Sequence, residues 1–423
     1  MAPSSTHYYF SLGMLLIIIF TPQHSFEQTP PKLSTIDLTI LLTIKNSLTD
    51  LPGSTFFSSW NFSSADPCTA FAGLTCSLST PSTLRVTTLD LGAGRFGSLG
   101  LAGSLPESLT RLTELTQLIL NPGVVTGPIP SQLGQLVNLR VLSLPHNRLT
   151  GPVPPSLLLV RGLHTLDLGF NQLTGRIPPS LLTELTQLRV LILADNHLTG
   201  ELPESTQHSE LLHLDLKSNN LVGPIPPTLP LNLRYVSLSK NNMWGPITNG
   251  PLGSLSQLEY LDLSQNHFSG SLPLSLLRPS LSSLQLHHNN FSSTILKPQF
   301  VLQYPENSII DLSFNSFSGP LPEAVAGATT VLLNNNRFSG PVPEPFIHGL
   351  DQGTIKTLYL QHNFLDDFPT KKHLGSTLPD EVEVCLAYNC MVPPAGLNIC
   401  PASATGELSR PADQCAVFHN NRR

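Results

Sequence analysis

The sequence predicts an α/β solenoid, a coil in which short strands stack into one parallel sheet on the concave face. Three observations support this fold class. A leucine-containing motif returns every 21 to 27 residues. A second motif containing Gly and Pro follows most of its copies. The six cysteines lie in two groups, one before the repeats and one at their end. A period of this length is typical of proteins built from stacked repeats.

The first motif has the form L-x-x-L-x-L-x-x-N-x-L, as in the segments 163–171 and 188–196. Clear copies begin at Leu139, Leu163, Leu188, Leu211, Leu233, Leu258, Leu281, Asn307, Ala328 and Ile355. Weaker copies begin near Val86, Leu115 and Glu381, which gives about thirteen in all. This period is the signature of leucine-rich repeats. We therefore predict a right-handed leucine-rich repeat superhelix with a parallel concave sheet and disulfide-containing caps at both ends.

Alternation along each short strand separates a buried face from an exposed one. In the strand around Leu166, the side chains of Leu166 and Leu168 are expected to point inward and Asp167 outward. A single copy cannot bury its leucines, so the copies share one continuous core. The Asn that ends each motif is expected to satisfy backbone groups of neighbouring turns, as a structural ladder. The ladder comprises Asn147, Asn171, Asn196, Asn219, Asn241, Asn266, Asn289, Asn315, Asn336 and Asn363.

The second motif reads L-T-G-x-I-P or a close variant, as in 173–178, 221–226 and 317–322. Gly permits a tight turn there, and Pro suits a strand start or a sheet edge. Over residues 36–415 the chain resembles plant-type extracellular leucine-rich repeat proteins, whose consensus carries L-x-G-x-I-P. The resemblance implies a second, short sheet beside the concave one and a twist of the solenoid.

The N-terminal region also resembles that family. Trp60, the segment 66–68 (Asp-Pro-Cys) and the segment 73–76 (Gly-Leu-Thr-Cys) match the family's cap, which implies a disulfide between Cys68 and Cys76. The preceding segment 37–48 has helical apolar spacing and is expected to cover the open end of the core.

Four cysteines lie at the other end, and their pairing cannot be read from the sequence. They are Cys385, Cys390, Cys400 and Cys415. A structural zinc site is the alternative to disulfides, but the spacings are unlike those of zinc sites and the compartment is expected to be oxidising. The tail around them resembles, more loosely, that of plant receptor-like proteins without a kinase.

We divide the chain into four parts. Residues 1–25 are read as a signal peptide because the apolar run from Tyr8 to Phe20 is short for a membrane span. The N-terminal cap follows at 26–80, the solenoid at 81–391, and the C-terminal cap and tail at 392–423. These features predict a secreted, extracellular or cell-wall protein with no membrane span after signal cleavage. Tethering through an uncleaved N-terminal segment is the alternative.

Composition and motifs favour no catalytic, cofactor or metal site. The net charge of −6 leaves no basic footprint for nucleic acid. Outward Asp residues recur, but not in adjacent copies, so we read them as solvated consensus positions. Outward His residues lie too far apart along the stack to converge on one metal ion. No nucleophile elbow, P-loop or H-E-x-x-H motif occurs in a supporting context.

The variable outward positions are the candidates for binding. Tyr235 and Tyr260 occupy the same strand position in adjacent copies. Aromatic side chains on a rigid wall are frequent binding anchors, although Tyr is also simply a good strand former. The concave-face candidates are His213, Tyr235, Lys240, Trp244, Tyr260, Asp262, Gln285 and His287. Two N-x-S sequons predict glycans at Asn61 and Asn290.

Three irregularities interrupt the pattern. The insertion 92–103 lengthens the first copy, Gly123 replaces a ladder Asn, and the stretch 364–377 lacks the Gly-x-Ile-Pro turn. A loop at such a place either contacts a partner or is tolerated surface slack. We expect the second sheet to end near 364–377.

These features predict a non-enzymatic recognition protein. It would bind a peptide or protein on its concave face and act through a membrane partner such as a receptor kinase. The alternative is a defence protein resembling plant polygalacturonase inhibitors, which share the L-x-G-x-I-P repeat. A structural wall protein is less favoured, because no Ser-Pro-rich tail follows the repeats.

Overall fold

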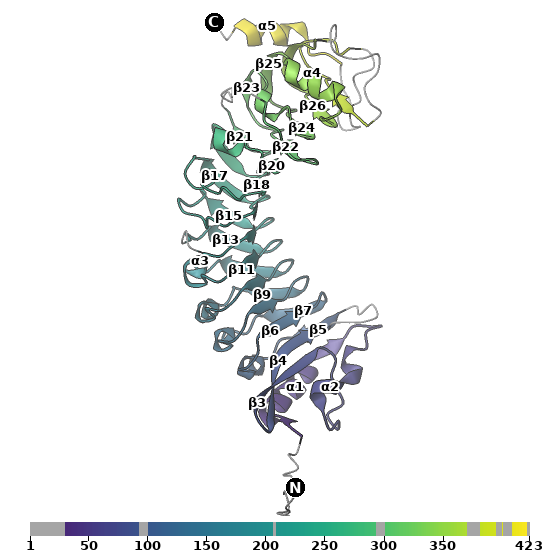
Figure 1. The fold of residues 1–423 in the computed structure, drawn as a ribbon, viewed down its shortest axis with the longest axis vertical. Coiled ribbons are helices and arrows are strands. Elements are labelled where there is room, and N and C mark those ends of the chain that lie inside the picture. The colour runs from purple at the N-terminus through teal and green to yellow at the C-terminus, as the bar shows by residue number, and fades with distance from the viewer. Residues whose placement is uncertain are drawn as a thin grey trace, which may run out of the picture.

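The computed structural model describes residues 30–92, 100–205, 209–292, 301–369, 381–394, 400 and 408–420. They form one elongated, curved coil with the N-terminal cap at one end and helix α5 (Ala412–Asn420) at the other (Figure 1). The predicted signal peptide and most of the insertion 92–103 lie outside the described residues.

One parallel sheet runs the length of the coil and contributes one strand per repeat. Its repeat strands are β4 (Thr83–Leu91), β6 (Gln117–Leu120), β8 (Val141–Ser143), β10 (Thr165–Asp167), β12 (Val190–Ile192), β14 (His213–Asp215), β16 (Tyr235–Ser237), β18 (Tyr260–Asp262), β20 (Ser283–Gln285), β22 (Ile309–Asp311), β24 (Thr330–Leu332), β26 (Thr357–Tyr359) and β28 (Glu383–Cys385). The cap adds β1 (Lys32–Leu33) and the antiparallel β3 (Leu74–Thr80), for 15 strands in all. The thirteen repeat strands confirm the predicted leucine-rich repeat solenoid.

A second sheet follows the ladder positions, as the family resemblance implied. It contains β2 (Leu48–Asp50), β5 (Leu101–Ser104), β7 (Val124–Pro128), β9 (Arg148–Gly151), β11 (Gln172–Arg176), β13 (His197–Glu201), β15 (Asn220–Gly223), β17 (Asn242–Pro246), β19 (His267–Gly270) and β21 (Asn290–Phe291). A shorter sheet of β23 (Ser318–Gly319), β25 (Arg337–Pro341) and β27 (Phe364–Asp367) follows. Within the described residues it ends at β27, where the Gly-x-Ile-Pro turn is missing.

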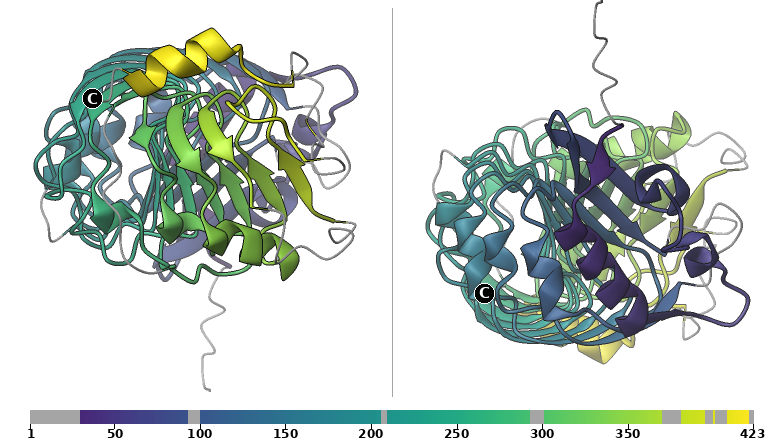
Figure 2. Two further views of the ribbon diagram at one scale, coloured as in Figure 1. Left: turned by 90° about the horizontal axis from the view of Figure 1, so that it is seen from above. Right: turned by 90° about the horizontal axis from the view of Figure 1, so that it is seen from below.

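Short helices form the opposite wall of the coil, which closes a leucine core between them and the sheets (Figure 2). They are η2 (Glu107–Arg111), η3 (Leu133–Gln135), η4 (Pro155–Leu159), α3 (Leu181–Glu184), η5 (Leu274–Leu276), η6 (Glu323–Val325) and α4 (Glu344–Asp351). Most begin directly after the Pro of the second motif, whose fixed φ suits the start of a helix. The leucines of each strand, such as Leu166 and Leu168, are fully buried.

The Asn ladder forms as predicted. The Asn171 amide donates to the carbonyls of Leu144, Leu168 and Gly169 at 2.9–3.1 Å, and its oxygen accepts from the Leu149 N–H at 3.0 Å. Each amide therefore joins adjacent coils. Asn389, which the motif search missed, continues the ladder in the last coil.

The N-terminal cap covers the open end of the core. Helix α1 (Thr35–Ser47) buries Ile40, Leu41 and Ile44 there, as its apolar spacing predicted. The Arg85 guanidinium contacts the buried Asp37 carboxylate at 2.9 Å. Trp60 is fully buried among the rings of η1 (Phe56–Ser59) and of the residue after α2 (Pro67–Ala70). The disulfide between Cys68 and Cys76 closes this cap.

The C-terminal cap resolves a pairing that the sequence left open. Cys385 joins Cys400, and Cys390 joins Cys415 at the start of α5. The two loops interleave, so the tail is held against the last coil at both of its disulfides. Helix α5 crosses the C-terminal end of the coil (Figure 2).

Candidate functional site

The concave sheet aligns the predicted binding residues in columns. Because β14, β16 and β18 pair in register, His213 lies opposite Tyr235, and Tyr235 lies opposite Tyr260. The rings of His213 and Tyr235 stack with centroids 4.1 Å apart and planes within 3°. Those of Tyr235 and Tyr260 stack at 4.3 Å and 5°. We call these three stacked side chains the aromatic ridge; it runs along the axis of the solenoid.

Carboxylates lie beside the ridge in the next outward column. Asp215 and Asp262 follow His213 and Tyr260 by two residues and therefore point to the same face of the sheet. Each is buried, and one oxygen accepts the N–H two residues further on, from Lys217 at 3.2 Å or Ser264 at 3.0 Å. These carboxylates thus stabilise the turn after each strand and also lie on the concave face.

Burial and neighbouring charges shift the pKa values of this cluster. Burial raises the pKa of Asp215, and the Lys217 backbone N–H and ammonium oppose that rise in part. Burial lowers the pKa of His213, against the attraction of Asp215. Burial and the Asp262 carboxylate raise the pKa of the Tyr260 hydroxyl. These shifts favour the uncharged forms of His213 and Tyr260 in the ridge.

The C-terminal side of the ridge continues with polar groups. The Gln285 amide lies 3.5 Å from the Tyr260 hydroxyl and donates to Ser283 at 3.3 Å. His287 Nδ1 lies 3.0 Å from Asp311 Oδ2, as an ion-pair contact rather than a well-angled hydrogen bond. Burial lowers the pKa of His287, but the Asp311 carboxylate outweighs burial and raises it overall.

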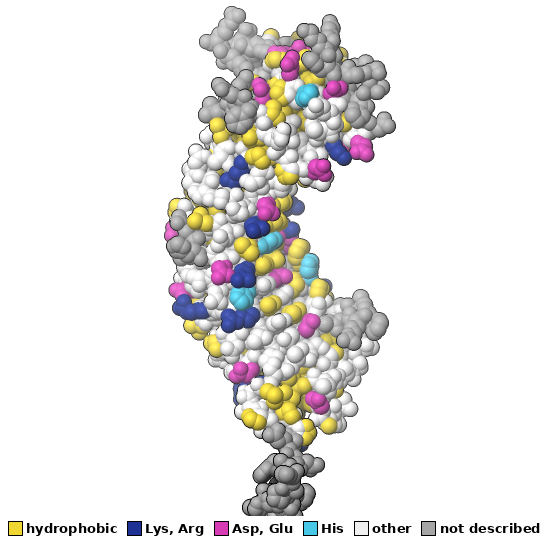
Figure 3. All heavy atoms as spheres, viewed as in Figure 1, with side chains coloured by type: hydrophobic (Ala, Val, Ile, Leu, Met, Phe, Trp, Pro, Cys, Tyr) yellow, Lys and Arg dark blue, Asp and Glu magenta, His cyan; other side chains and the backbone are white. Residues whose placement is uncertain are grey.

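A third column follows the strands and has a left-handed backbone without glycine. Lys240 has φ of 54°, and the equivalent residues of the other coils have φ between 51° and 59°. Rings stack here too, His146 on Phe170 at 4.0 Å and His288 on Phe314 at 4.1 Å. Neither stacked pair was among the binding candidates predicted from the sequence. Figure 3 shows hydrophobic and histidine side chains close together over the middle of the coil.

The structure corrects one of the predicted concave residues. Trp244 lies on β17 of the second sheet and is 53% exposed, so its assignment to the concave face is wrong. The short distance in sequence from Lys240 suggested proximity to the ridge, but the chain turns at the ladder Asn between them. His287 lies directly before the third-column residue His288, and the other candidates lie in the three concave columns.

The predicted glycosylation sites differ in position. Asn61 is exposed beside the buried Trp60 in the cap. Asn290 is exposed on β21, the last strand of the long second sheet, and so lies off the concave face.

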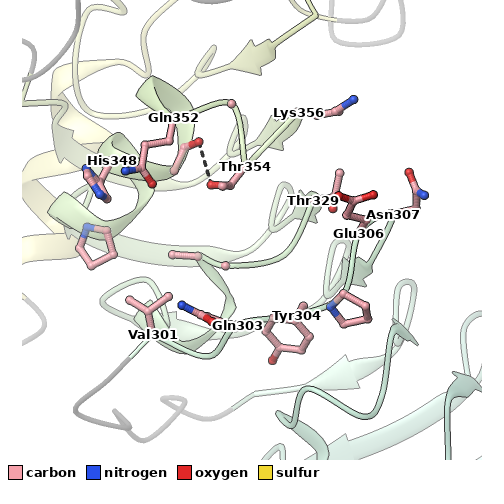
Figure 4. A pocket seen from close by; sticks show the side chains of 16 residues that line it. Val301, Gln303, Tyr304, Glu306, Asn307, Thr329, His348, Gln352, Thr354 and Lys356 are labelled. Atoms are coloured by element: carbon pink, nitrogen blue, oxygen red, sulfur yellow. Dashed lines mark hydrogen bonds between the residues drawn. The ribbon is translucent and has the colours of Figure 1, made fainter.

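A separate pocket of about 670 Å³ lies between α4 and the segment 301–307 (Figure 4). Gln303, Glu306, Thr329, Gln352 and Lys356 are among its lining residues. Among the described residues, no group of three His, Cys, Asp or Glu side chains is arranged to hold a metal ion. No helix in the described part of the chain is long and apolar enough to cross a membrane.

Comparison with known families supports the cap and the repeats. Residues 35–77 match the leucine rich repeat N-terminal domain. Five segments, 138–158, 162–183, 187–209, 210–231 and 257–278, match the Leucine Rich Repeat family. The chain is also 35% identical over 95 residues to Receptor-like protein 31 of Arabidopsis thaliana, a match that covers 22% of this chain and 11% of that protein. The predicted resemblance to plant extracellular receptor-like proteins is therefore confirmed.

Solved structures share the coil. The ectodomain of the Arabidopsis thaliana membrane receptor kinase GASSHO1/SCHENGEN3, solved in complex with CASPARIAN STRIP INTEGRITY FACTOR 2, matches with a TM-score of 0.58 and 27% identity. The match covers 83% of this chain and 50% of that ectodomain, so the chain spans about half its length. A plant ice-binding protein, 24% identical, matches with a TM-score of 0.55 over 82% of this chain and all of that one, and shares the fold.

Proposed function

We propose that this chain is a non-enzymatic recognition protein that binds a peptide or protein segment on its concave face. The observation that carries the proposal is the aromatic ridge of His213, Tyr235 and Tyr260. Three rings held in register by the sheet lose little conformational entropy on binding, and Tyr is enriched at binding hot spots. The similarity to a receptor ectodomain with a bound partner supports the same conclusion.

We also propose that the protein acts through a membrane partner such as a receptor kinase. The similarity of the coil to the ectodomain of a membrane receptor kinase supports this proposal. The predicted signal peptide and the two sequons support a secreted or cell-wall location.

The test is a proximity-labelling pull-down of the tagged protein from intact plant tissue. Wild type is compared with Tyr235→Leu/Tyr260→Leu, which removes the stacked rings but keeps apolar volume. Trp244→Leu is the matched control, because this exposed aromatic lies on the second sheet. We expect wild type and the control to recover a small peptide or a receptor kinase, and the double variant not to recover it.

Three other outcomes would change the proposal. Recovery of a pectin-degrading enzyme in the same pattern would favour the polygalacturonase-inhibitor alternative. Equal recovery from all variants would remove the concave ridge from the proposal. Loss in Trp244→Leu alone would move the binding surface to the second sheet.

Location is tested on the same material. N-terminal sequencing should find the mature chain beginning near residue 26, and glycosidase treatment should lower its mass. A chain that retains residues 1–25 and sediments with membranes would favour the tethered alternative.

A further inference from the structure

The pocket beside α4 lies where the length of the coils changes abruptly. Successive copies of the repeat begin at Leu281, Asn307, Ala328 and Ile355, so coils of 26 and 27 residues flank one of 21 residues. The short coil has only the three-residue η6 on the wall of short helices, whereas the next coil has the eight-residue α4. The short coil is therefore recessed between its neighbours, and the pocket occupies this recess (Figure 4).

Three consecutive coils line this pocket. The segment 301–307 forms one wall, residues from 345–356 form the other, and residues from 326–329 of the short coil form the floor. Gly327 allows the floor to approach the first wall, because a Cβ atom there would overlap the Leu302 carbonyl oxygen. Asn307 replaces the leucine that is buried at this position of most coils, and it is exposed at the pocket instead. The recess is thus built into the backbone of the three coils.

The walls carry polar side chains that the protein itself does not use. They are Gln303, Glu306 and Asn307 on the first wall, and His348 and Gln352 on α4 and at its end. All five are exposed, and none of these side chains makes a hydrogen bond or an ion pair with another described residue. Each amide offers two donor hydrogens and one acceptor oxygen. The pocket therefore presents free donors and acceptors from both walls.

The charges of the lining favour a neutral ligand. Glu306 supplies a carboxylate, and the Lys356 ammonium, also in the lining, lies 3.1 Å from the Glu381 carboxylate. An anion would be repelled by Glu306 without a free lysine to balance it, and one exposed carboxylate holds a cation only weakly. An apolar ligand would leave the amides without partners. A neutral ligand with many hydroxyls fits best, since each hydroxyl both donates and accepts.

We propose that this pocket binds a short, neutral oligosaccharide. Its hydroxyls bond the amides of Gln303, Asn307 and Gln352, and the C–H faces of its rings pack on Pro305 and Pro345. The volume of about 670 Å³ lies within the range of roughly 300–1,000 Å³ for small-molecule sites. The pocket lies in the coils of β22, β24 and β26, away from the aromatic ridge on β14, β16 and β18. The inference therefore goes beyond the proposed function and does not rest on it.

The test is isothermal titration calorimetry of the full chain with four probes. Cellotetraose and xylotetraose represent neutral wall polysaccharides, a high-mannose glycan represents the sugar of a partner glycoprotein, and tetragalacturonate is the anionic comparison. We expect at least one neutral probe to bind with a Kd below about 1 mM, and tetragalacturonate to bind at least about tenfold more weakly than that probe. Preference for a wall sugar or for the high-mannose glycan identifies the source of the ligand, and either supports the inference.

Two double variants separate the pocket from the rest of the surface. Gln303→Ala/Gln352→Ala removes one amide from each wall of the pocket. Gln132→Ala/Gln135→Ala removes two exposed amides at η3, on the same wall of short helices but in a distant coil. All four side chains are exposed, so both variants should melt at the temperature of wild type. We expect the first pair to weaken binding of the neutral probe about tenfold and the second less than about twofold.

Three results would overturn this inference. They are the absence of binding by all three neutral probes at about 10 mM, equal or tighter binding of tetragalacturonate, and equal losses of affinity in the two double variants. Each of these results leaves the proposed function standing, because its test depends on Tyr235 and Tyr260 of the concave face. Conversely, a pull-down that does not depend on those two residues would overturn the proposed function and leave the pocket as a separate site.

Discussion

The amide of Asn241 donates a 3.0 Å hydrogen bond to the carbonyl of Leu216, one coil earlier. The same amide also donates to Leu238 and Ser239 of its own coil, and its oxygen accepts from the Leu221 N–H at 3.0 Å. One buried side chain thus bonds four backbone groups. The carbonyls of Leu216, Leu238 and Ser239 also accept from Asn219, Asn266 and the Ser218 N–H, whereas the Leu221 N–H depends on Asn241. Repetition of this arrangement connects the coils that carry the binding surface.

Replacing Asn241 with Ala should therefore be costly. The variant leaves the buried Leu221 N–H without its partner, and we expect a loss of about 1–3 kcal/mol in the free energy of unfolding. Urea denaturation followed by circular dichroism measures it. Asn242→Ala, at an exposed Asn on β17 in the same coil, is the control and should change stability by less than about 1 kcal/mol. Similar effects of the two variants would contradict a structural ladder.

Most of the fold could be predicted from the repeat period. Leucine spacing and the ladder Asn are local features, repeated often enough to predict the strands and the concave sheet, and the apolar spacing of 37–48 predicted the cap helix α1. Trp244 was misplaced because distance in sequence does not show on which side of the ladder turn a residue lies. The pairing of Cys385 with Cys400 could not be predicted, since four cysteines permit three pairings.

The candidate site was only partly predictable. Tyr235 and Tyr260 occupy equivalent positions in the sequence, and register alone places them together. Their stacking, and that of His213, depends on side-chain torsions that no motif encodes. The left-handed backbone at Lys240 was equally hidden, because neither Gly nor a single residue type marks that column.

Asp215→Asn should not destabilise the protein at neutral pH. Burial raises the pKa of Asp215, so the folded state holds this proton more tightly than the unfolded chain does. The stability from this group is present at low pH and lost as the pH rises through the folded pKa. Asn removes the cost of the buried charge and keeps the acceptor for the Lys217 N–H.

We expect Asp215→Asn to match or exceed wild type at pH 7 by up to roughly 1 kcal/mol, with the difference shrinking as the pH falls toward 3. Urea midpoints at both pH values measure this. A loss above about 1 kcal/mol at pH 7 would mean that attraction to Lys217 outweighs burial. A variant that is stable but binds ligand poorly would mark a residue retained for function.

His287 should stabilise the protein in acid relative to neutral solution. Its pKa is raised because the Asp311 carboxylate outweighs the effect of burial. The stabilisation is therefore fully present below the ordinary His value of about 6.5 and is lost as the pH rises through the folded pKa. His287→Gln should cost roughly 1 kcal/mol more at pH 5.5 than at pH 8.

The adjacent His288 offers a control of opposite sign. Burial, and next the charge of His287, lower its pKa, so its favourable contribution is present above about pH 6.5 and is lost as the pH falls. His288→Gln should therefore lose less stability than wild type when the pH is lowered from 8 to 5.5. The same pH trend in both variants would contradict a specific ion-pair contact between His287 and Asp311.

Arg410 should anchor the C-terminal cap. Its guanidinium carbon lies 4.1 Å from the centre of the Phe364 ring and 4.5 Å from that of Tyr388, and its Nε donates to the Asn363 carbonyl at 3.0 Å. Two cation–π contacts and one charged hydrogen bond together contribute about 2–3 kcal/mol. Arg410→Ala should lose that amount of local stability, so hydrogen exchange should quicken in β26 and β28 while β8 and β10 are unchanged.

Arg410→Lys should retain only part of the stabilisation by Arg410, because an ammonium lacks the planar face that stacks on both rings. Arg337→Ala, at an exposed arginine on β25, should leave exchange in β28 unaltered; equal acceleration there would mean that the disulfides alone hold the cap.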